Sequence, residues 1–167
     1  SERDPSVSPE EAEINANWDR IKQQEKALKP AAQNTTGGLL TDVPVTLPAL
    51  NRAVKLQKKA SRVGFDWPDV QGVLDKIREE LAEVEAEIAG ADPERLEHEV
   101  GDLLFAVSNL ARHLKVDAEV ALRGTNTRFC SRFAVVEAQV EQLGGWDKAS
   151  AAEMEAAWQR AKQKENH

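Results

Sequence analysis

Residues 79–104 constrain the fold most strongly, because aliphatic residues keep helical spacing there although the surrounding positions are densely acidic. A first apolar stripe repeats every three or four residues through Val73, Ile77, Leu81, Val84 and Ile88. A second stripe follows through Leu96, Val100, Leu103, Val107, Leu110 and Leu114. Between them, Gly90 suits a helix end, Asp92 an N-cap and Pro93 a first helical turn. This pattern predicts a helical hairpin with helices over about residues 69–89 and 93–115.

The other segments also favour helices, and none shows the alternation of a β-strand. Further helices are predicted over residues 12–29, 48–63, 117–143 and 149–163. Pro30 ends the first of these helices, and Gly144 and Gly145 separate the last two. We therefore expect an all-α protein, an antiparallel helical bundle whose uncovered apolar faces are completed by dimerisation.

A length of 167 residues favours one domain with a tail. We expect residues 1–46 to form a polar lead-in with a short helix and a flexible loop, and residues 47–167 to form the domain. The first residues, polar and containing two prolines, favour disorder. Because the chain begins at Ser1 and its only methionine is Met154, we expect the native N-terminus to lie further upstream.

Charge and cysteine content limit the functional classes. A formal net charge of −7 argues against nonspecific binding of nucleic acid polymers or acidic membranes. Cys130 is the only cysteine, so an internal disulfide is impossible and a cytoplasmic location is expected. The sequence contains no apolar run long enough to cross a membrane.

The acidic residues of the two hairpin helices occupy related positions around the helix axes. Since each residue advances by about 100°, Glu80 borders the first apolar stripe and Glu83 lies beyond it. Glu99 and Asp102 repeat this arrangement on the second helix. In an antiparallel hairpin centred on Ala91, Glu83 is level with Glu99, and Glu80 with Asp102. The four carboxylates are therefore predicted to share one edge of the helix contact.

Carboxylates gathered in this way would repel one another and weaken the hairpin unless a cation bound them. A single ExxE pair would favour a solvated charged face, but two pairs in matching register favour a metal site. Oxygen ligands suit Mg²⁺, with Mn²⁺ as a possible substitute. A di-iron bundle fits less well, because such sites use Glu-x-x-His pairs and Asp102 stands three residues after Glu99.

EELAE at residues 79–83 and EVGD at residues 99–102 resemble the EExxE and ExxD motifs of the MazG family of all-α nucleoside triphosphate pyrophosphohydrolases. Further segments resemble the C-terminal MazG domain in the same order, namely LPALNRAVKLQKKASRVGFDW, GDLLFAVSNLARHL, NTRFCSRF and WQRAK. The resemblance implies a homodimer that hydrolyses NTPs or dNTPs to monophosphate and pyrophosphate, by water attack at the α-phosphorus. The alternative is a catalytically silent helical regulatory or protein-interaction module with a structural Mg²⁺ site.

The resemblance also implies roles for single residues. It makes Glu80, Glu83, Glu99 and Asp102 the Mg²⁺ ligands, the same four that helix geometry groups. The catalytic candidates are Glu79 and Glu80, and Glu79 is the candidate for the base that accepts a proton from water, or for an outer-shell role.

Substrate contacts implied by the resemblance are Asn126, Arg128, Arg132, Trp158 and Lys162. Taken alone, the two arginines would favour surface ion pairs and Trp158 a place in a core or dimer interface. The helix predicted over residues 48–63 is basic and adds the candidates Lys55, Lys59 and Arg62. The alternative for these three residues is a solvated basic face. Trp67 is expected to anchor a turn, and His98 and His113 to be structural or exposed.

Overall fold

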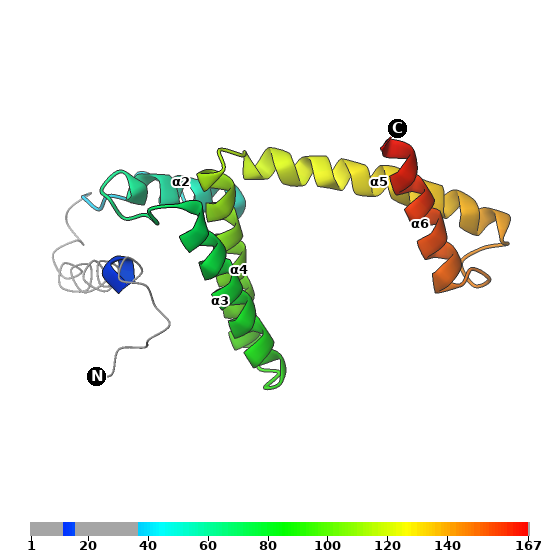
Figure 1. Ribbon diagram of the computed structural model, residues 1–167, viewed down its shortest axis with the longest axis horizontal. Coiled ribbons are helices and arrows are strands. Elements are labelled where there is room, and N and C mark those ends of the chain that lie inside the picture. The colour runs from blue at the N-terminus through cyan, green and yellow to red at the C-terminus, as the bar shows by residue number, and fades with distance from the viewer. Residues whose placement is uncertain (1–11, 16–36, 167) are drawn as a thin grey trace. The chain divides into compact units, whose positions relative to one another are not determined.

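The computed structural model describes residues 12–15 and 37–166, and every regular element in these ranges is a helix (Figure 1). The all-α class is therefore confirmed. From residue 48 onward each predicted helix is present, as α2 (Ala49–Ser61), α3 (Val70–Ile88), α4 (Pro93–His113), α5 (Ala118–Gln142) and α6 (Ala151–Glu165). Residues 12–15 are helical. The rest of the helix predicted over residues 12–29, and most of the lead-in, lie outside the described residues.

The chain divides into two compact units. The N-terminal unit ends at Ala118 and contains α2, α3 and α4, and the C-terminal unit starts at Glu119 and contains α6 and nearly all of α5. In the described part of the chain, no helix combines the length and apolarity that a membrane span requires.

Capping side chains define both helices of the predicted hairpin. The Asp69 side chain accepts a hydrogen bond from the backbone N–H of Gly72 at the start of α3, and Asp92 accepts one from the N–H of Glu94 at the start of α4. Pro93 occupies the first turn of α4, as predicted. The left-handed residue of the connection is Ala91, with φ of 50°. Its neighbour Gly90, which the sequence suggested for the helix end, does not adopt a positive φ.

Within the N-terminal unit, α3 and α2 both pack against α4 (Figure 1). Val73 of α3 is 1% exposed, and Ala106 and Ser108 of α4 are also buried. Gln57 of α2 is buried as well and donates a hydrogen bond from Nε2 to the carbonyl oxygen of Phe105 at 2.8 Å. The apolar stripes are only partly covered by this packing. Stripe residues that remain exposed are Leu81, Ile88, Val100, Val107 and Leu114.

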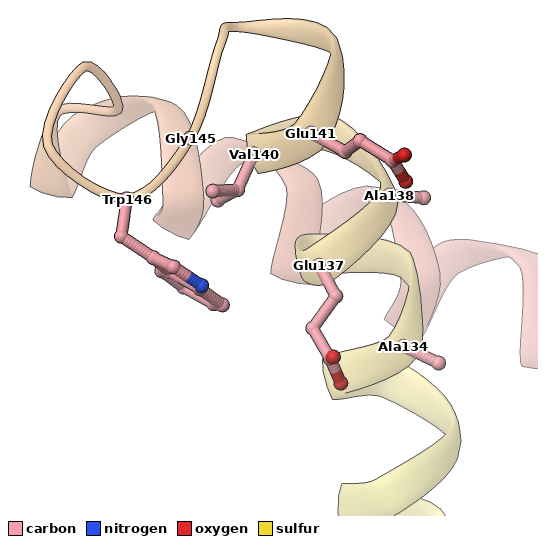
Figure 2. Close-up of a pocket in the computed structure, with 7 residues that line it drawn as sticks. All are labelled: Ala134, Glu137, Ala138, Val140, Glu141, Gly145 and Trp146. Carbon is pink, nitrogen blue, oxygen red and sulfur yellow. The ribbon is translucent and has the colours of Figure 1, made fainter.

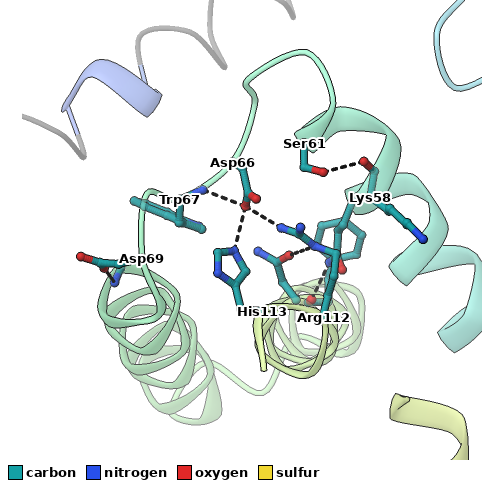
Figure 3. Close-up of polar contacts among 11 residues, drawn as sticks. Lys58, Ser61, Asp66, Trp67, Asp69, Arg112 and His113 are labelled. Carbon is teal, nitrogen blue, oxygen red and sulfur yellow. Dashed lines mark hydrogen bonds and ion pairs between the residues drawn. The ribbon is translucent and has the colours of Figure 1, made fainter. Parts of the chain in front are cut away.

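A polar network fastens the α2–α3 connection to the end of α4. Figure 3 shows the Asp66 carboxylate between the backbone nitrogen of Trp67 and the side chains of Arg112 and His113. Asp66 Oδ1 lies 2.5 Å from Arg112 Nη2 and 2.8 Å from His113 Nε2. The Trp67 ring packs so closely against Gly72 that a Cβ there would lie 2.9 Å from Cε3. The predicted anchoring role of Trp67 and the structural role of His113 are confirmed.

The C-terminal unit is built around contacts between α5 and α6. Val136 and Val140 of α5 are buried with Ala157 of α6. Phe133, Ala149, Met154 and Trp158 pack against this cluster. Between the helices, Gly144 and Gly145 have φ of 98° and 114°, which confirms the predicted helix break. Ser150 and Glu153 then form a capping box that starts α6.

Replacing Asp66 by Asn is expected to lower the free energy of unfolding at neutral pH by about 1–3 kcal/mol, since the partly buried guanidinium of Arg112 loses its carboxylate and His113 loses a hydrogen-bond partner. Burial raises the pKa of Asp66, but hydrogen bonds from Arg112 and His113 outweigh burial and hold the pKa below its ordinary value. A carboxyl group with a depressed folded-state pKa stabilises the protein above its unfolded-state pKa, and this contribution is lost as the pH falls through the folded-state pKa. Urea unfolding between pH 7 and pH 3 measures the free energy of unfolding of wild type and of Asp66→Asn. The difference between the two proteins should shrink below a pH of about 4.

The matched control is Asp75→Asn, because Asp75 pairs with Arg78 on the exposed face of α3. This change should alter stability by no more than about 0.5 kcal/mol. A difference between wild type and Asp66→Asn that stays constant down to pH 3 would contradict the interpretation.

Candidate active site

Three carboxylates meet in the middle of the α3–α4 hairpin. Glu80 of α3 and Glu99 and Asp102 of α4 each offer an oxygen, and these oxygens all lie within 4.8 Å of one another. Glu80 is 8% exposed, whereas Glu99 and Asp102 are half-buried. We call these three residues the carboxylate cluster.

The hairpin geometry explains the cluster. Glu80 and Asp102 are eleven residues before and after Ala91, so an antiparallel pair of helices brings them to the same level. Glu99 lies one turn earlier on the same face of α4. The structure therefore brings together three of the four carboxylates that the sequence grouped. Glu83 is exposed and is not among the three, although its charge acts on Glu99.

The charges of the cluster oppose one another. Desolvation raises the pKa of Glu99, and the negative charges of Glu83, Asp102 and Glu80 raise this pKa further, while His98 acts in the opposite direction. His98 Nε2 lies 3.2 Å from Asp102 Oδ2 on the exposed side of α4. A site with only oxygen donors, partial burial and excess negative charge fits a hard divalent cation.

Lys76 of α3 contacts the same site. Its Nζ lies 3.0 Å from Glu80 Oε1 and 3.2 Å from Glu79 Oε1. Burial lowers the pKa of Lys76, but the hydrogen bond and charge of Glu80, together with Glu79, outweigh burial and raise it. Lys76 was not among the site residues predicted from the sequence, although its spacing of four residues from Glu80 was a visible signal.

The cationic candidates on α2 differ in their surroundings. Lys59 forms an ion pair with Asp42 of the preceding loop, and this contact holds the pKa of Asp42 below its ordinary value. Lys55 and Arg62 are exposed. Lys59 therefore has a structural partner in the same unit, while the other two candidates present their charges to solvent.

In the C-terminal unit, the structure brings Arg132 and Trp158 together. The Arg132 guanidinium lies 5.8 Å from the centre of the Trp158 ring, and its Nη2 lies 2.7 Å from Glu165 Oε2. Phe129 contacts Trp158 from α5, with ring centres 5.3 Å apart. Trp158 is only partly buried, so part of its surface packs on the α5–α6 core and part remains accessible.

The remaining candidates of this unit are exposed. Arg128 of α5 donates a hydrogen bond to Thr125 Oγ1 at 2.9 Å. Asn126 and Lys162 lie on the surfaces of α5 and α6. A pocket elsewhere in the unit contains none of the predicted site residues (Figure 2). It is lined by Ala134, Glu137, Ala138, Val140, Glu141, Gly145 and Trp146.

Known proteins are similar to this chain over most of its length. Residues 69–136, which include the carboxylate cluster, match the MazG nucleotide pyrophosphohydrolase domain. The chain is 45% identical, over 96% of its length, to a nucleoside triphosphate pyrophosphohydrolase of Escherichia coli K12. It is 39% identical, over 87% of its length, to the nucleoside triphosphate pyrophosphohydrolase/pyrophosphatase MazG of Thermotoga maritima. An uncharacterized protein of Bacillus subtilis, YabN, is 41% identical over 93% of the chain.

These relatives are longer proteins. The chain spans 60% of the Escherichia coli protein, 54% of the Thermotoga maritima protein and 31% of the Bacillus subtilis protein. The similarity therefore covers nearly all of this chain but only a part of each relative.

Replacing Glu99 by Gln is expected to raise the thermal midpoint of the metal-free protein by about 1–3 °C, since it removes one of several repelling charges. The same change should reduce the stabilisation that added Mg²⁺ produces in wild type, because a ligand is lost. Differential scanning calorimetry with and without Mg²⁺ measures both effects. Glu97→Gln, an exposed position on the same helix and outside the cluster, is the control and should change neither. A lower metal-free midpoint for Glu99→Gln would contradict the repulsion.

Proposed function

We propose that this chain, whose residues 69–136 match the MazG nucleotide pyrophosphohydrolase domain, hydrolyses nucleoside triphosphates, ribo or deoxyribo, to the nucleoside monophosphate and pyrophosphate. The observation that carries the proposal is the carboxylate cluster, which lies within the matched residues. The names of the Escherichia coli and Thermotoga maritima relatives support the same reaction.

The cluster residues Glu80, Glu99 and Asp102, together with Glu83 one turn further along α3, would hold Mg²⁺, with Mn²⁺ as a substitute. The purely oxygen donor set and the mutual repulsion that raises the pKa of Glu99 support this assignment. When bound, the ion neutralises triphosphate charge and favours ionisation of a water molecule.

Glu79 and Glu80 are the proposed catalytic residues. Glu80 is buried in the cluster and would hold the cation, whereas the neighbouring Glu79 side chain is 62% exposed and accessible to water. In the proposed reaction the water oxygen bonds to the α-phosphorus, the bond from this phosphorus to the bridging oxygen breaks, and Glu79 accepts the water proton. Pyrophosphate then leaves with the electron pair of the broken bond.

The cationic and aromatic side chains would bind the rest of the nucleotide. Arg132 would exchange its ion pair with Glu165 for a phosphate oxygen, and the accessible part of Trp158 offers a surface for stacking a base. The other proposed substrate contacts are Lys55, Lys59, Arg62, Asn126, Arg128 and Lys162.

The active assembly is proposed to be a homodimer of a domain that extends over residues 47–167. Large apolar side chains that one chain leaves exposed support this proposal, among them Leu104, Phe105 and Phe129. Size-exclusion chromatography with light scattering should give a mass twice the 18.4 kDa of the chain. A monomer across the micromolar range would refute the dimer. The cytoplasmic location suggested by the lone cysteine stays a prediction.

Product analysis tests the reaction directly. We expect wild type, incubated with Mg²⁺ and a panel of NTPs and dNTPs, to yield monophosphate and pyrophosphate separable by anion exchange. Glu80→Gln and Asp102→Asn should lower kcat/KM by at least about 100-fold, since each removes a charged ligand. In ¹⁸O-water the label should enter the monophosphate, because water attacks the α-phosphorus.

Glu85→Gln is the matched control, because Glu85 is an exposed acid on α3 outside the cluster. It should keep wild-type activity. Label in pyrophosphate would overturn attack at the α-phosphorus. Intact nucleotides after incubation with folded wild type would favour the catalytically silent module.

A further inference from the structure

Lys76 places an ammonium group between two carboxylates of very different exposure. Its Nζ lies 3.0 Å from Glu80, whose side chain is 11% exposed, and 3.2 Å from Glu79, whose side chain is 62% exposed. Lys76 itself is partly buried, with 35% of its side chain exposed. The lysine therefore bridges a buried member of the carboxylate cluster and an exposed neighbour outside it.

Local helix preference does not explain the contact between Lys76 and Glu80. With lysine on the N-terminal side, a pair at i and i+4 has the less favourable orientation. Burial of Glu80 gives a better reason, because an ionised carboxylate removed from water needs a counter-charge. The need is greater here since Glu99 and Asp102 add like charges within 4.8 Å. A second basic residue near the cluster is His98 of α4, which is exposed and contacts Asp102.

We propose that Lys76 is an exchangeable counter-cation of the carboxylate cluster. In the metal-free protein it neutralises Glu80, and when a divalent cation binds it gives up Glu80 and keeps Glu79. This inference rests on the metal site of the proposed function and adds a role for a residue outside the ligand set.

Two features of the contact make the exchange physically reasonable. An ammonium group and a divalent cation at the same carboxylate repel each other, and partial burial strengthens this repulsion. The lysine stem is long and flexible, and Glu79 already lies within reach on the exposed side. Lys76 can therefore withdraw from Glu80 without losing its other partner.

Removing the charge of Lys76 should have two effects of opposite sign. The metal-free protein should become less stable, because Glu80 stays buried without its counter-charge. The affinity for the divalent cation should increase, because the cation no longer displaces an ammonium group. A purely structural lysine would give the first effect without the second.

The test compares wild type, Lys76→Met and Arg78→Met by isothermal titration with MgCl₂ and by thermal unfolding in EDTA. For Lys76→Met we expect Mg²⁺ to bind about tenfold more tightly, a factor that corresponds to about 1.4 kcal/mol. The metal-free midpoint should fall by about 3–8 °C, and saturating Mg²⁺ should recover most of the loss. Arg78→Met is the matched control, because it removes a cation from the same helix that pairs with Asp75 outside the cluster.

Two further variants keep the proposal falsifiable. Lys76→Gln removes the charge but retains a hydrogen-bond donor, so it serves if the methionine variant does not fold, and it should also bind Mg²⁺ more tightly. Lys76→Arg keeps the charge and should restore an affinity near that of wild type. Unchanged or weaker Mg²⁺ binding by Lys76→Met and Lys76→Gln would overturn the exchange, as would equal gains in Arg78→Met.

Failure of the proposed function has a different signature. If the metal site itself is wrong, wild type and all variants will show neither Mg²⁺ heats nor Mg²⁺-dependent stabilisation. If only the role of Lys76 is wrong, wild type will bind Mg²⁺ and the Lys76 variants will not bind it more tightly.

Discussion

The carboxylates of Glu80, Glu99 and Asp102 repel one another across the α3–α4 contact, and the rest of the hairpin has to offset this repulsion. Two helices that pack through apolar stripes would gain nothing for stability from three carboxylates at the middle of their contact. Such a cluster persists only if the surrounding packing holds the helices together and a cation compensates the charge. Lys76 supplies part of this compensation in the metal-free protein. A divalent ion would supply more, and the site is accordingly suited to bind one.

The hairpin is fixed at both ends, which explains how the cluster keeps its geometry. At one end, the Gly90–Ala91 turn and the Asp92 cap join α3 directly to α4. At the other end, Asp66 lies next to the start of α3 and holds Arg112 and His113 at the end of α4. Together these contacts set the register of the two helices. Glu80 and Asp102 therefore meet between the turn at one end and the Asp66 contacts at the other.

The chain covers its own apolar surface incompletely. Val73 and Ala106 are buried in one unit, and Val136, Val140 and Ala157 form a small buried cluster in the other. Several large aliphatic and aromatic side chains stay exposed, and burying them would contribute roughly 25 cal/mol for each Å² removed from water. A second copy of the chain would bury such surface, which connects the proposed dimer to the limited core of one chain.

Local sequence patterns were enough to predict the helices from residue 48 onward, the hairpin turn and all three members of the carboxylate cluster. Helical periodicity and capping are local properties, and the distance of Glu80 and Asp102 from the turn fixes their level in the hairpin. Which long-range partners meet depends on how the helices pack, and helical periodicity does not predict it. Asp66 contacts Arg112 and His113, which lie 46 and 47 positions further along the chain. Arg132 binds Glu165, which lies 33 positions further along. The tertiary structure also set how deeply Glu80 is buried, because helical periodicity places Glu80 beside the apolar stripe but does not describe the helix packed alongside.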